Sequence, residues 1–195
     1  MSIRVIGGIA KGKRLKLVPG DTTRPVMDRV KEALFNIIGT DIYDAEFLDL
    51  FAGTGSVGIE ALSRGAAHAV LIDTEKKAIQ TIKENLATTG FTAKATLRHM
   101  DAFNYLEREP IRAYNFIYIA PPQYKSLWQK SLLALDSRPA WLGAETLVIV
   151  QIDPAEEESL PLKHMEIDDK RRYGNTLLLF LQTKSAANDV PLEES

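Results

Sequence analysis

The residues best placed to do chemistry lie in a glycine-rich segment that reads Asp49-Leu-Phe-Ala-Gly53-Thr-Gly55-Ser-Val-Gly58. An apolar run leads into these glycines and a helical pattern follows them, which is typical of a strand–turn–helix unit. Glycine lets the backbone approach a ligand without a Cβ clash, and the first turn of a helix has free N–H groups. The segment therefore predicts a ligand site; a tight turn that binds nothing is the alternative.

The spacing of Gly53, Gly55 and Gly58 also matches the dinucleotide fingerprint Gly-x-Gly-x-x-Gly. A dinucleotide would place its pyrophosphate at the start of the helix. Asp49, however, precedes Gly53 by four residues, and its carboxylate suits a cation better than a pyrophosphate. The pattern favours S-adenosylmethionine, whose sulfonium and ammonium groups are positive, over NAD. An NAD-dependent oxidoreductase stays an alternative, although no acid or base for hydride transfer is evident.

Two further acids follow the next two predicted strands. Asp73 comes 24 residues after Asp49 and could accept both hydroxyls of a ribose, as the acid of dinucleotide folds does. Asp101, beside Ala102, could contact an adenine amino group. Each aspartate also precedes a predicted helix, so an N-cap is the structural alternative; for Asp73 the two roles are compatible.

A pair of prolines ends a later predicted strand, in the segment Ile119-Ala120-Pro121-Pro122-Gln123-Tyr124. Proline has no backbone N–H, so carbonyls at this strand end are left without neighbouring donors. Such carbonyls could accept hydrogen bonds from a substrate amine. A rigid loop between a strand and a helix is the alternative interpretation.

A repeating strand–helix pattern must position these residues. It predicts strands over 46–51, 68–72, 95–99, 114–119 and 146–151, and helices over 28–38, 57–64, 75–88, 102–108 and 125–135. Strands over 163–167 and 176–181, joined through 171–174, are predicted to pair antiparallel at one edge. Residues 3–18 predict two short strands. The fold class is therefore α/β: a mostly parallel, doubly wound sheet with a late antiparallel strand and an N-terminal β-hairpin extension.

Composition is consistent with one core. Of the 195 residues, 45% are hydrophobic, and we expect a single domain over 1–184, with a hairpin extension over 1–20 and a flexible tail over 185–195. The chain has no cysteine, which excludes disulfides, thiolate metal sites and cysteine nucleophiles, and its three histidines lack ligand spacing. No apolar run approaches the ~20 residues that span a bilayer. A cytoplasmic protein without metal or membrane attachment is expected.

Charge is distributed unevenly along the chain. The net charge is −2, yet five bases precede the first acid, Asp21: Arg4, Lys11, Lys13, Arg14 and Lys16. Acids gather toward the other end, at 156–158 and 168–169. This asymmetry predicts a basic face for phosphates, whereas a solvated hairpin without a partner is the alternative.

Several segments together resemble the RsmD family of bacterial methyltransferases, which act on N2 of a guanine in 16S ribosomal RNA. The resemblance covers roughly residues 3–182 and is most specific where the glycine turn combines with the helix Asp28-Arg29-Val30-Lys31-Glu32. The matching segments are Arg24–Asn36, Leu48–Gly55, Glu60–Ala66, Asn85-Leu86 and Arg171–Thr176.

The resemblance implies a Rossmann-like, seven-stranded methyltransferase fold that binds S-adenosylmethionine and acts on 16S ribosomal RNA or the small ribosomal subunit; we expect a monomer. The methionine part of the cofactor would lie on the turn formed by Asp49, Phe51, Ala52, Gly53, Thr54 and Gly55. Asp73 would hold the ribose, and Asp101 with Ala102 the adenine. Arg24, Asp28 and Arg29 would lie near the cofactor and target base, and Arg4, Lys11, Lys13 and Arg14 would contact phosphates. The catalytic loop would be formed by Ala120, Pro121, Pro122 and Tyr124.

One departure from the family pattern affects the catalytic loop. The family reads Asp-Pro-Pro followed by Tyr or Phe, whereas here Ala120 replaces the acid and Gln123 takes the aromatic position, with Tyr124 one residue later. The carbonyls of Ala120 and Pro121 would then have to orient the amine for a direct in-line transfer. The alternatives are a methyltransferase acting on another nucleic acid or a protein amide, and a degenerate nucleic-acid-binding module without turnover.

Overall fold

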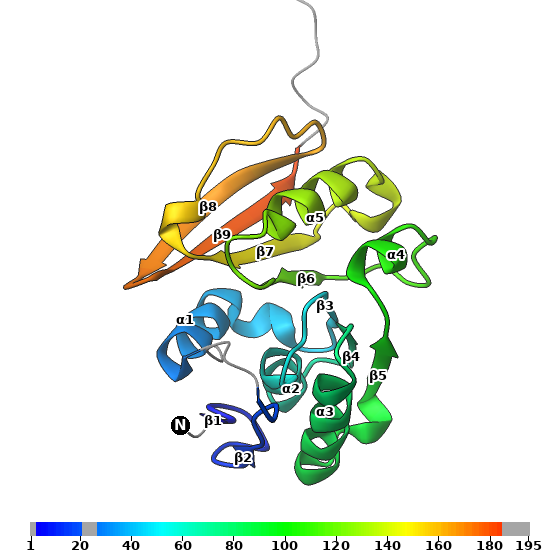
Figure 1. Cartoon of the computed structure of the whole chain (residues 1–195), viewed down its shortest axis with the longest axis vertical. Helices are drawn as coiled ribbons and strands as arrows, with labels where there is room; N and C mark the ends of the chain where they lie inside the picture. The colour runs from blue at the N-terminus through cyan, green and yellow to red at the C-terminus, as the bar shows by residue number, and fades with distance from the viewer. Residues whose placement is uncertain (1–2, 21–26, 185–195) are drawn as a thin grey trace, which may run out of the picture.

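The computed structural model describes residues 3–20 and 27–184, and its main feature is a seven-stranded sheet flanked by helices (Figure 1). The strands are β3 (Glu46–Asp49), β4 (His68–Asp73), β5 (Ala95–His99), β6 (Phe116–Ile119), β7 (Leu147–Ile152), β8 (Met165–Tyr173) and β9 (Thr176–Thr183). They lie in the order β5-β4-β3-β6-β7-β9-β8. A separate antiparallel pair joins β1 (Ile3–Arg4) to β2 (Arg14–Leu15).

Five strands of the sheet are parallel, and the chain changes direction across the sheet between β3 and β6. From β3 the chain moves outward through β4 to β5, then returns to β6 on the other side of β3. In open α/β sheets, ligands bind at the carboxyl ends of the strands beside such a reversal. β9 is antiparallel to both β7 and β8. The predicted fold class, with its late antiparallel strand and N-terminal hairpin, is confirmed.

Helices cover both faces of the sheet. They are α1 (Asp28–Ile38), α2 (Ser56–Ser63), α3 (Lys76–Thr89), α4 (Ala102–Leu106) and α5 (Leu127–Asp136), with short 3-10 helices η1 (Gly39–Ile42), η2 (Thr92–Lys94), η3 (Pro139–Trp141) and η4 (Pro154–Glu156). One core cluster contains residues of α1, α2 and α3, and a second contains residues of α4 and α5. Side chains of β3 alternate between them, because Phe47 belongs to the first and Leu48 to the second.

The predicted element boundaries agree closely with the structure except in β8. Residues 171–174 were expected to link two strands, but β8 continues through Tyr173 and the turn is formed by Gly174 and Asn175. That interpretation was wrong because β8 is an edge strand with mostly exposed side chains, so no apolar alternation marks it. A register shift between Ile167 and Asp169 further breaks the period of two. Residues 185–195, predicted to be a tail, lie outside the described residues.

Candidate cofactor and substrate site

The glycine turn after β3 is joined to the acid at the end of β4. Asp73 Oδ2 accepts a hydrogen bond of 2.8 Å from the Gly53 N–H, and its Oδ1 accepts one of 2.8 Å from the Glu75 N–H. Burial raises the pKa of Asp73, although these two N–H groups favour the ionised form. Asp73 thus fixes the position of the turn and also satisfies the N–H of Glu75, the residue that precedes α3, while its contact with a ribose stays a prediction.

Asp49 is a buried carboxyl group at the end of β3. Asp49 is 1% exposed, and the Phe51 N–H donates to the Asp49 Oδ1 over 3.3 Å. Burial raises the pKa of Asp49 to about 7, with the charge of Asp73 adding to the effect and the Phe51 hydrogen bond opposing it. A carboxyl group held this far from water is stabilised as an anion when a positive group comes close.

The backbone of the turn borders open space at its first glycine. Gly53 has φ +54°, in the region that side chains rarely adopt, and a Cβ placed on it would meet no atom within 4 Å. Gly58, in contrast, has no such space, because a Cβ there would collide with Leu71. The first glycine therefore borders open space, whereas Gly58 allows α2 to pack closely against β4. An open turn next to a buried acid suits a nucleotide that carries a positive sulfonium.

Asp101 serves as the N-cap of α4. Its Oδ1 accepts from the Phe103 N–H at 2.8 Å and from the Asn104 N–H at 3.1 Å. The N-cap alternative is therefore confirmed for this residue. The position also follows β5, beside the strand that ends in Asp73. The three aspartates thus follow adjacent parallel strands at one edge of the sheet.

The loop after β6 holds Tyr124 in a strained conformation. Ala120 is half-buried and Pro121 buried, whereas Pro122 is exposed and Tyr124 is 70% exposed. Tyr124 has φ +59°, which is uncommon for a residue with a side chain. Its N–H donates to Glu156 Oε1 over 2.8 Å, and a hydrogen bond to the Asp153 side chain raises the pKa of its phenol. Two acids from around η4 therefore hold this loop, a role that the sequence did not reveal.

Most of the predicted RNA-binding residues are exposed, on the N-terminal hairpin and at the start of α1. Lys11, Arg14 and Arg29 are exposed. Arg4 pairs with Asp28 at 3.1 Å, and Lys13 Nζ donates to the Thr88 carbonyl over 3.0 Å. Both Arg4 and Asp28 keep substantial exposure, so this ion pair is open to exchange with a phosphate. Arg24 lies outside the described residues.

Glu60 anchors the N-terminal segment to α2, and sequence reasoning assigned it no role. Its carboxylate is fully buried and accepts from the N–H groups of Ile6, at 2.8 Å, and Gly7, at 2.7 Å. Arg64 pairs with it at 2.8 Å and Lys31 at 3.4 Å. Lys31 is 1% exposed, and burial lowers its pKa, opposed by the charge of Glu60. Lys31 therefore supports the fold and does not add to the basic surface.

Asn85 links the hairpin to the glycine turn and was likewise missed. It lies in α3, is fully buried, and its side chain bonds both the N–H and the carbonyl of Lys16 as well as the carbonyl of Thr54. The signal for it in the sequence is an amide on the apolar stripe of this helix, next to Leu86. The glycine turn and the hairpin are thus both positioned by one side chain.

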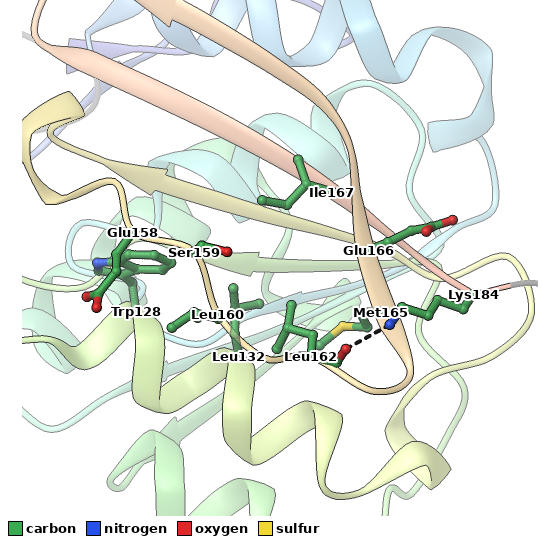
Figure 2. Close-up of a pocket in the computed structure, with 10 residues that line it drawn as sticks. All are labelled: Trp128, Leu132, Glu158, Ser159, Leu160, Leu162, Met165, Glu166, Ile167 and Lys184. Atoms are coloured by element: carbon green, nitrogen blue, oxygen red, sulfur yellow. Dashed lines mark hydrogen bonds between the residues drawn. The ribbon is translucent and has the colours of Figure 1, made fainter.

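A separate hollow of about 340 Å³ lies between α5, the segment before β8 and β8 itself (Figure 2). Its floor is apolar, and Lys184 Nζ at its rim donates to the Leu162 carbonyl over 2.7 Å. The lining residues are Trp128, Leu132, Glu158, Ser159, Leu160, Leu162, Met165, Glu166, Ile167 and Lys184. None of them belongs to the predicted site, so the hollow and the glycine turn are distinct places in the fold.

Residues 3–20 and 27–184 contain neither a candidate membrane span nor a candidate metal cluster. No helix there is long and apolar enough to cross a membrane. In the same residues, no three histidine, aspartate or glutamate side chains gather where they could hold a metal ion.

Comparison with known proteins connects this geometry to a family. The family model described as conserved hypothetical protein 95 matches residues 3–182. YlbH of Bacillus subtilis is 40% identical over 176 residues, covering 89% of this chain and 95% of that protein. The ribosomal RNA small subunit methyltransferase D of Escherichia coli is 36% identical over 159 residues, covering 82% of this chain and 78% of that protein.

Solved structures show the same fold. The structure of yhhF from Escherichia coli has a TM-score of 0.82 and 31% identity, covering 94% of this chain and 99% of that chain. An RNA methyltransferase from Salinibacter ruber, in complex with S-adenosyl-L-homocysteine, has a TM-score of 0.64 and 17% identity, covering 85% of this chain and 98% of that chain. The latter likeness concerns the fold alone.

Proposed function

Because this chain belongs to the RsmD family of S-adenosylmethionine-dependent methyltransferases, we propose that it methylates the exocyclic N2 of a guanine in 16S ribosomal RNA. The observation that carries this proposal is the glycine turn itself. Gly53 borders open space, its N–H is held by Asp73, and the buried Asp49 lies at the start of the same turn. This combination suits a nucleoside with a positive sulfonium better than a dinucleotide with a pyrophosphate.

We infer that each part of the turn holds a different part of the cofactor. When bound, S-adenosylmethionine supplies an electrophilic methyl group attached to a good leaving group. Asp49 would attract its positive end, with Phe51, Ala52, Gly53, Thr54 and Gly55 bordering the methionine part. Asp73 would accept from the ribose, and Asp101 with Ala102 would lie by the adenine. Both acids keep accepting capacity beyond their backbone bonds, since a carboxylate has about four lone-pair sites.

The loop after β6 would orient the amine of the target base. The carbonyls of Ala120 and Pro121 would accept hydrogen bonds from it, which directs the nitrogen lone pair toward the methyl group. Pro122 stiffens the loop, and the exposed ring of Tyr124 would stack on the base. Alignment of this kind is the main contribution that an enzyme makes to a methyl transfer. The displaced proton would pass to water.

The basic residues would bind the RNA around that base. Two groups of residues would contact backbone phosphates or lie next to the base. They are Arg4, Lys11, Lys13 and Arg14 on the hairpin, and Arg24, Asp28 and Arg29 before and within α1. Phosphate contacts orient a nucleic acid without reading its sequence. A guanine in structured RNA must leave its stack to reach the loop, which requires a basic rim to hold its neighbours.

The decisive experiment maps base methylation in 16S ribosomal RNA from cells with and without this protein, together with calorimetry of cofactor binding. We expect one guanine N2 methyl group to disappear and S-adenosylhomocysteine to bind. An unchanged map with intact cofactor binding would point to another nucleic acid or a protein amide. Cofactor binding without product on any RNA would favour the binding module that Ala120 suggests. Absence of cofactor binding would overturn the enzymatic function.

A further inference from the structure

The turn between β8 and β9 brings a basic segment to the edge of the sheet that contains the candidate site. Register places Ile152, at the end of β7, opposite Leu177, at the start of β9. Because β7 is parallel to β6, the turn after Tyr173 lies at the edge where the parallel strands end. Figure 1 shows this turn projecting from the sheet on the side where α1 begins. It therefore extends from the edge that carries the glycine turn and the loop after β6.

Charge is segregated along β8. Acids occupy its first half, at Glu166, Asp168 and Asp169, whereas bases occupy its second half, at Lys170, Arg171 and Arg172. At ~3.3 Å per residue, the three bases lie within about 13 Å of the turn. All three are exposed. The positive end of the strand is thus the end nearest the candidate site.

The bases of this segment are free to exchange partners. Lys170 pairs with Glu157 at 2.6 Å and Arg171 with Asp169 at 2.8 Å, both on the surface. Arg172 Nε donates to the Gly174 carbonyl over 3.2 Å and has no carboxylate partner among the described residues. Exposed ion pairs contribute little to stability, and guanidinium groups bind phosphate in a bidentate manner. A phosphate can therefore replace these contacts at small cost.

The two arginines point to opposite faces of the hairpin. Arg171 pairs in register with Leu178, whose side chain belongs to the core cluster under α1, α2 and α3. Arg172 pairs with Leu177, which belongs to the cluster under α4 and α5. Side chains of paired residues lie on the same face of a sheet. The hairpin consequently presents one guanidinium on each face beside its turn.

We propose that this basic arm, defined by Lys170, Arg171 and Arg172, binds backbone phosphates of the same RNA whose base is methylated. The inference rests on the proposed function. The N-terminal hairpin is anchored to α2 and α3 through Glu60 and Asn85, whereas the basic arm extends from the opposite end of the strand order. The strand that precedes the catalytic loop, β6, lies between these two parts. The target nucleotide is thus held between the N-terminal hairpin and the basic arm.

The test compares three variants in methylation of 16S RNA and of small ribosomal subunits, each prepared without the methyl group. In R171A/R172A both guanidinium groups are removed, whereas R171K/R172K keeps the charge. Lys163→Ala removes an exposed base just before the other end of β8. For R171A/R172A we expect KM for RNA to rise roughly tenfold and the slope of log affinity against log salt to fall by about 2. The values of kcat, cofactor affinity and the unfolding temperature should not change.

The outcomes separate this inference from the proposed function. Unchanged KM and salt slope in R171A/R172A, with normal methylation by the parent protein, would overturn the basic arm and leave the function intact. An equal loss in Lys163→Ala would also overturn it, because any removed charge would then have the same effect. If the parent protein methylated no RNA, the proposed reaction would fall; weaker RNA binding with a lower salt slope in R171A/R172A would then still show that the arm binds RNA phosphates, although not those of a methylated substrate.

Discussion

The side chain of Asn85 hydrogen-bonds both backbone groups of Lys16, as a neighbouring strand would. The Asn85 Oδ1 accepts from the Lys16 N–H at 2.8 Å, and its Nδ2 donates to the Lys16 carbonyl at 3.1 Å. The same Nδ2 donates to the Thr54 carbonyl at 2.9 Å. One buried amide therefore connects the N-terminal hairpin with the glycine turn.

Replacement of Asn85 by alanine should disturb both parts at once. Three backbone groups would lose their partner in a buried place, so we expect a loss of about 1–3 kcal/mol in the free energy of unfolding. Cofactor affinity should fall as well, measured by calorimetry. Lys83→Ala, on the exposed side of the same helix, is the matched control and should change neither. A stable Asn85→Ala protein with full cofactor affinity would contradict this role.

The buried ion pair of Glu60 and Lys31 predicts unequal effects of its two members. Glu60→Leu leaves the N–H groups of Ile6 and Gly7 without partners and leaves the buried Lys31 ammonium with only the Arg4 carbonyl, and we expect it to cost about 3–5 kcal/mol of unfolding free energy. Lys31→Met should cost less, because Glu60 keeps Arg64 and both N–H groups. Denaturant titration measures both. Equal losses, or a similar loss in the exposed control Glu32→Ala, would show the interpretation to be wrong.

The raised pKa of Asp49 predicts pH-dependent stability. Its pKa is about 7 in the folded protein against an ordinary 3.8, so the folded state binds more protons between these values. The free energy of unfolding should therefore fall as pH rises from about 4 to about 7, then level off. Asp49→Asn removes the titrating group and should flatten this part of the profile. An identical profile in the variant would contradict the assignment.

The same group predicts pH-dependent cofactor binding. A cationic ligand favours the ionised carboxylate, so affinity should rise with pH up to about 7, and binding below that pH should release a proton. Calorimetry in buffers of different ionisation enthalpy detects this proton. S-adenosylhomocysteine retains the ammonium group but lacks the sulfonium charge, so its affinity should depend less on pH. Equal pH dependence for both ligands would argue against a direct effect of the sulfonium.

Tyr124 and Gln123 can be distinguished by their effect on RNA binding. Loss of a stacked ring is worth roughly 1–3 kcal/mol, so Tyr124→Ala should raise KM for RNA by about 5- to 150-fold. Tyr124→Phe keeps the ring and should retain most of the affinity. Gln123→Ala is the comparison at the family's usual aromatic position. A larger effect of Gln123→Ala than of Tyr124→Ala would identify Gln123 as the contact with the base.

A substitution at Ala120 should increase the rate of methyl transfer. Ala120→Asp restores a side-chain acceptor for the amine, and one positioned hydrogen bond is worth on the order of a hundredfold in rate. We expect kcat to rise while cofactor affinity stays unchanged, measured by single-turnover methylation of the small subunit. A decrease in kcat would mean that this loop has adapted to alanine. The side chains that hold Tyr124, Asp153 and Glu156, would then be the first candidates for the compensating contacts.

The sheet and the acids at its edge could be predicted because each has a local signature. A buried strand that runs into glycines, and an aspartate that ends the next strand, are recognisable in a few consecutive residues. Glu60 and Asn85 could not be predicted, since the N-terminal backbone groups that they hold, those of Ile6, Gly7 and Lys16, lie 53 or more residues away along the chain. The anchors of Tyr124 were missed for the same reason: Glu156 is 32 residues away. The extent of β8 was missed because its exposed side chains follow no apolar period.

The position of β9 has a consequence for how the protein matures. This last strand inserts between β7 and β8, and all side chains from Leu177 to Leu181 are buried. Until residue 183 has left the site of protein synthesis, β7 lacks its outer neighbour and β8 has nothing to pair with. This edge of the sheet can therefore form only after β9 has been synthesised, and until then the unpaired edges of β7 and β8 are exposed to aggregation.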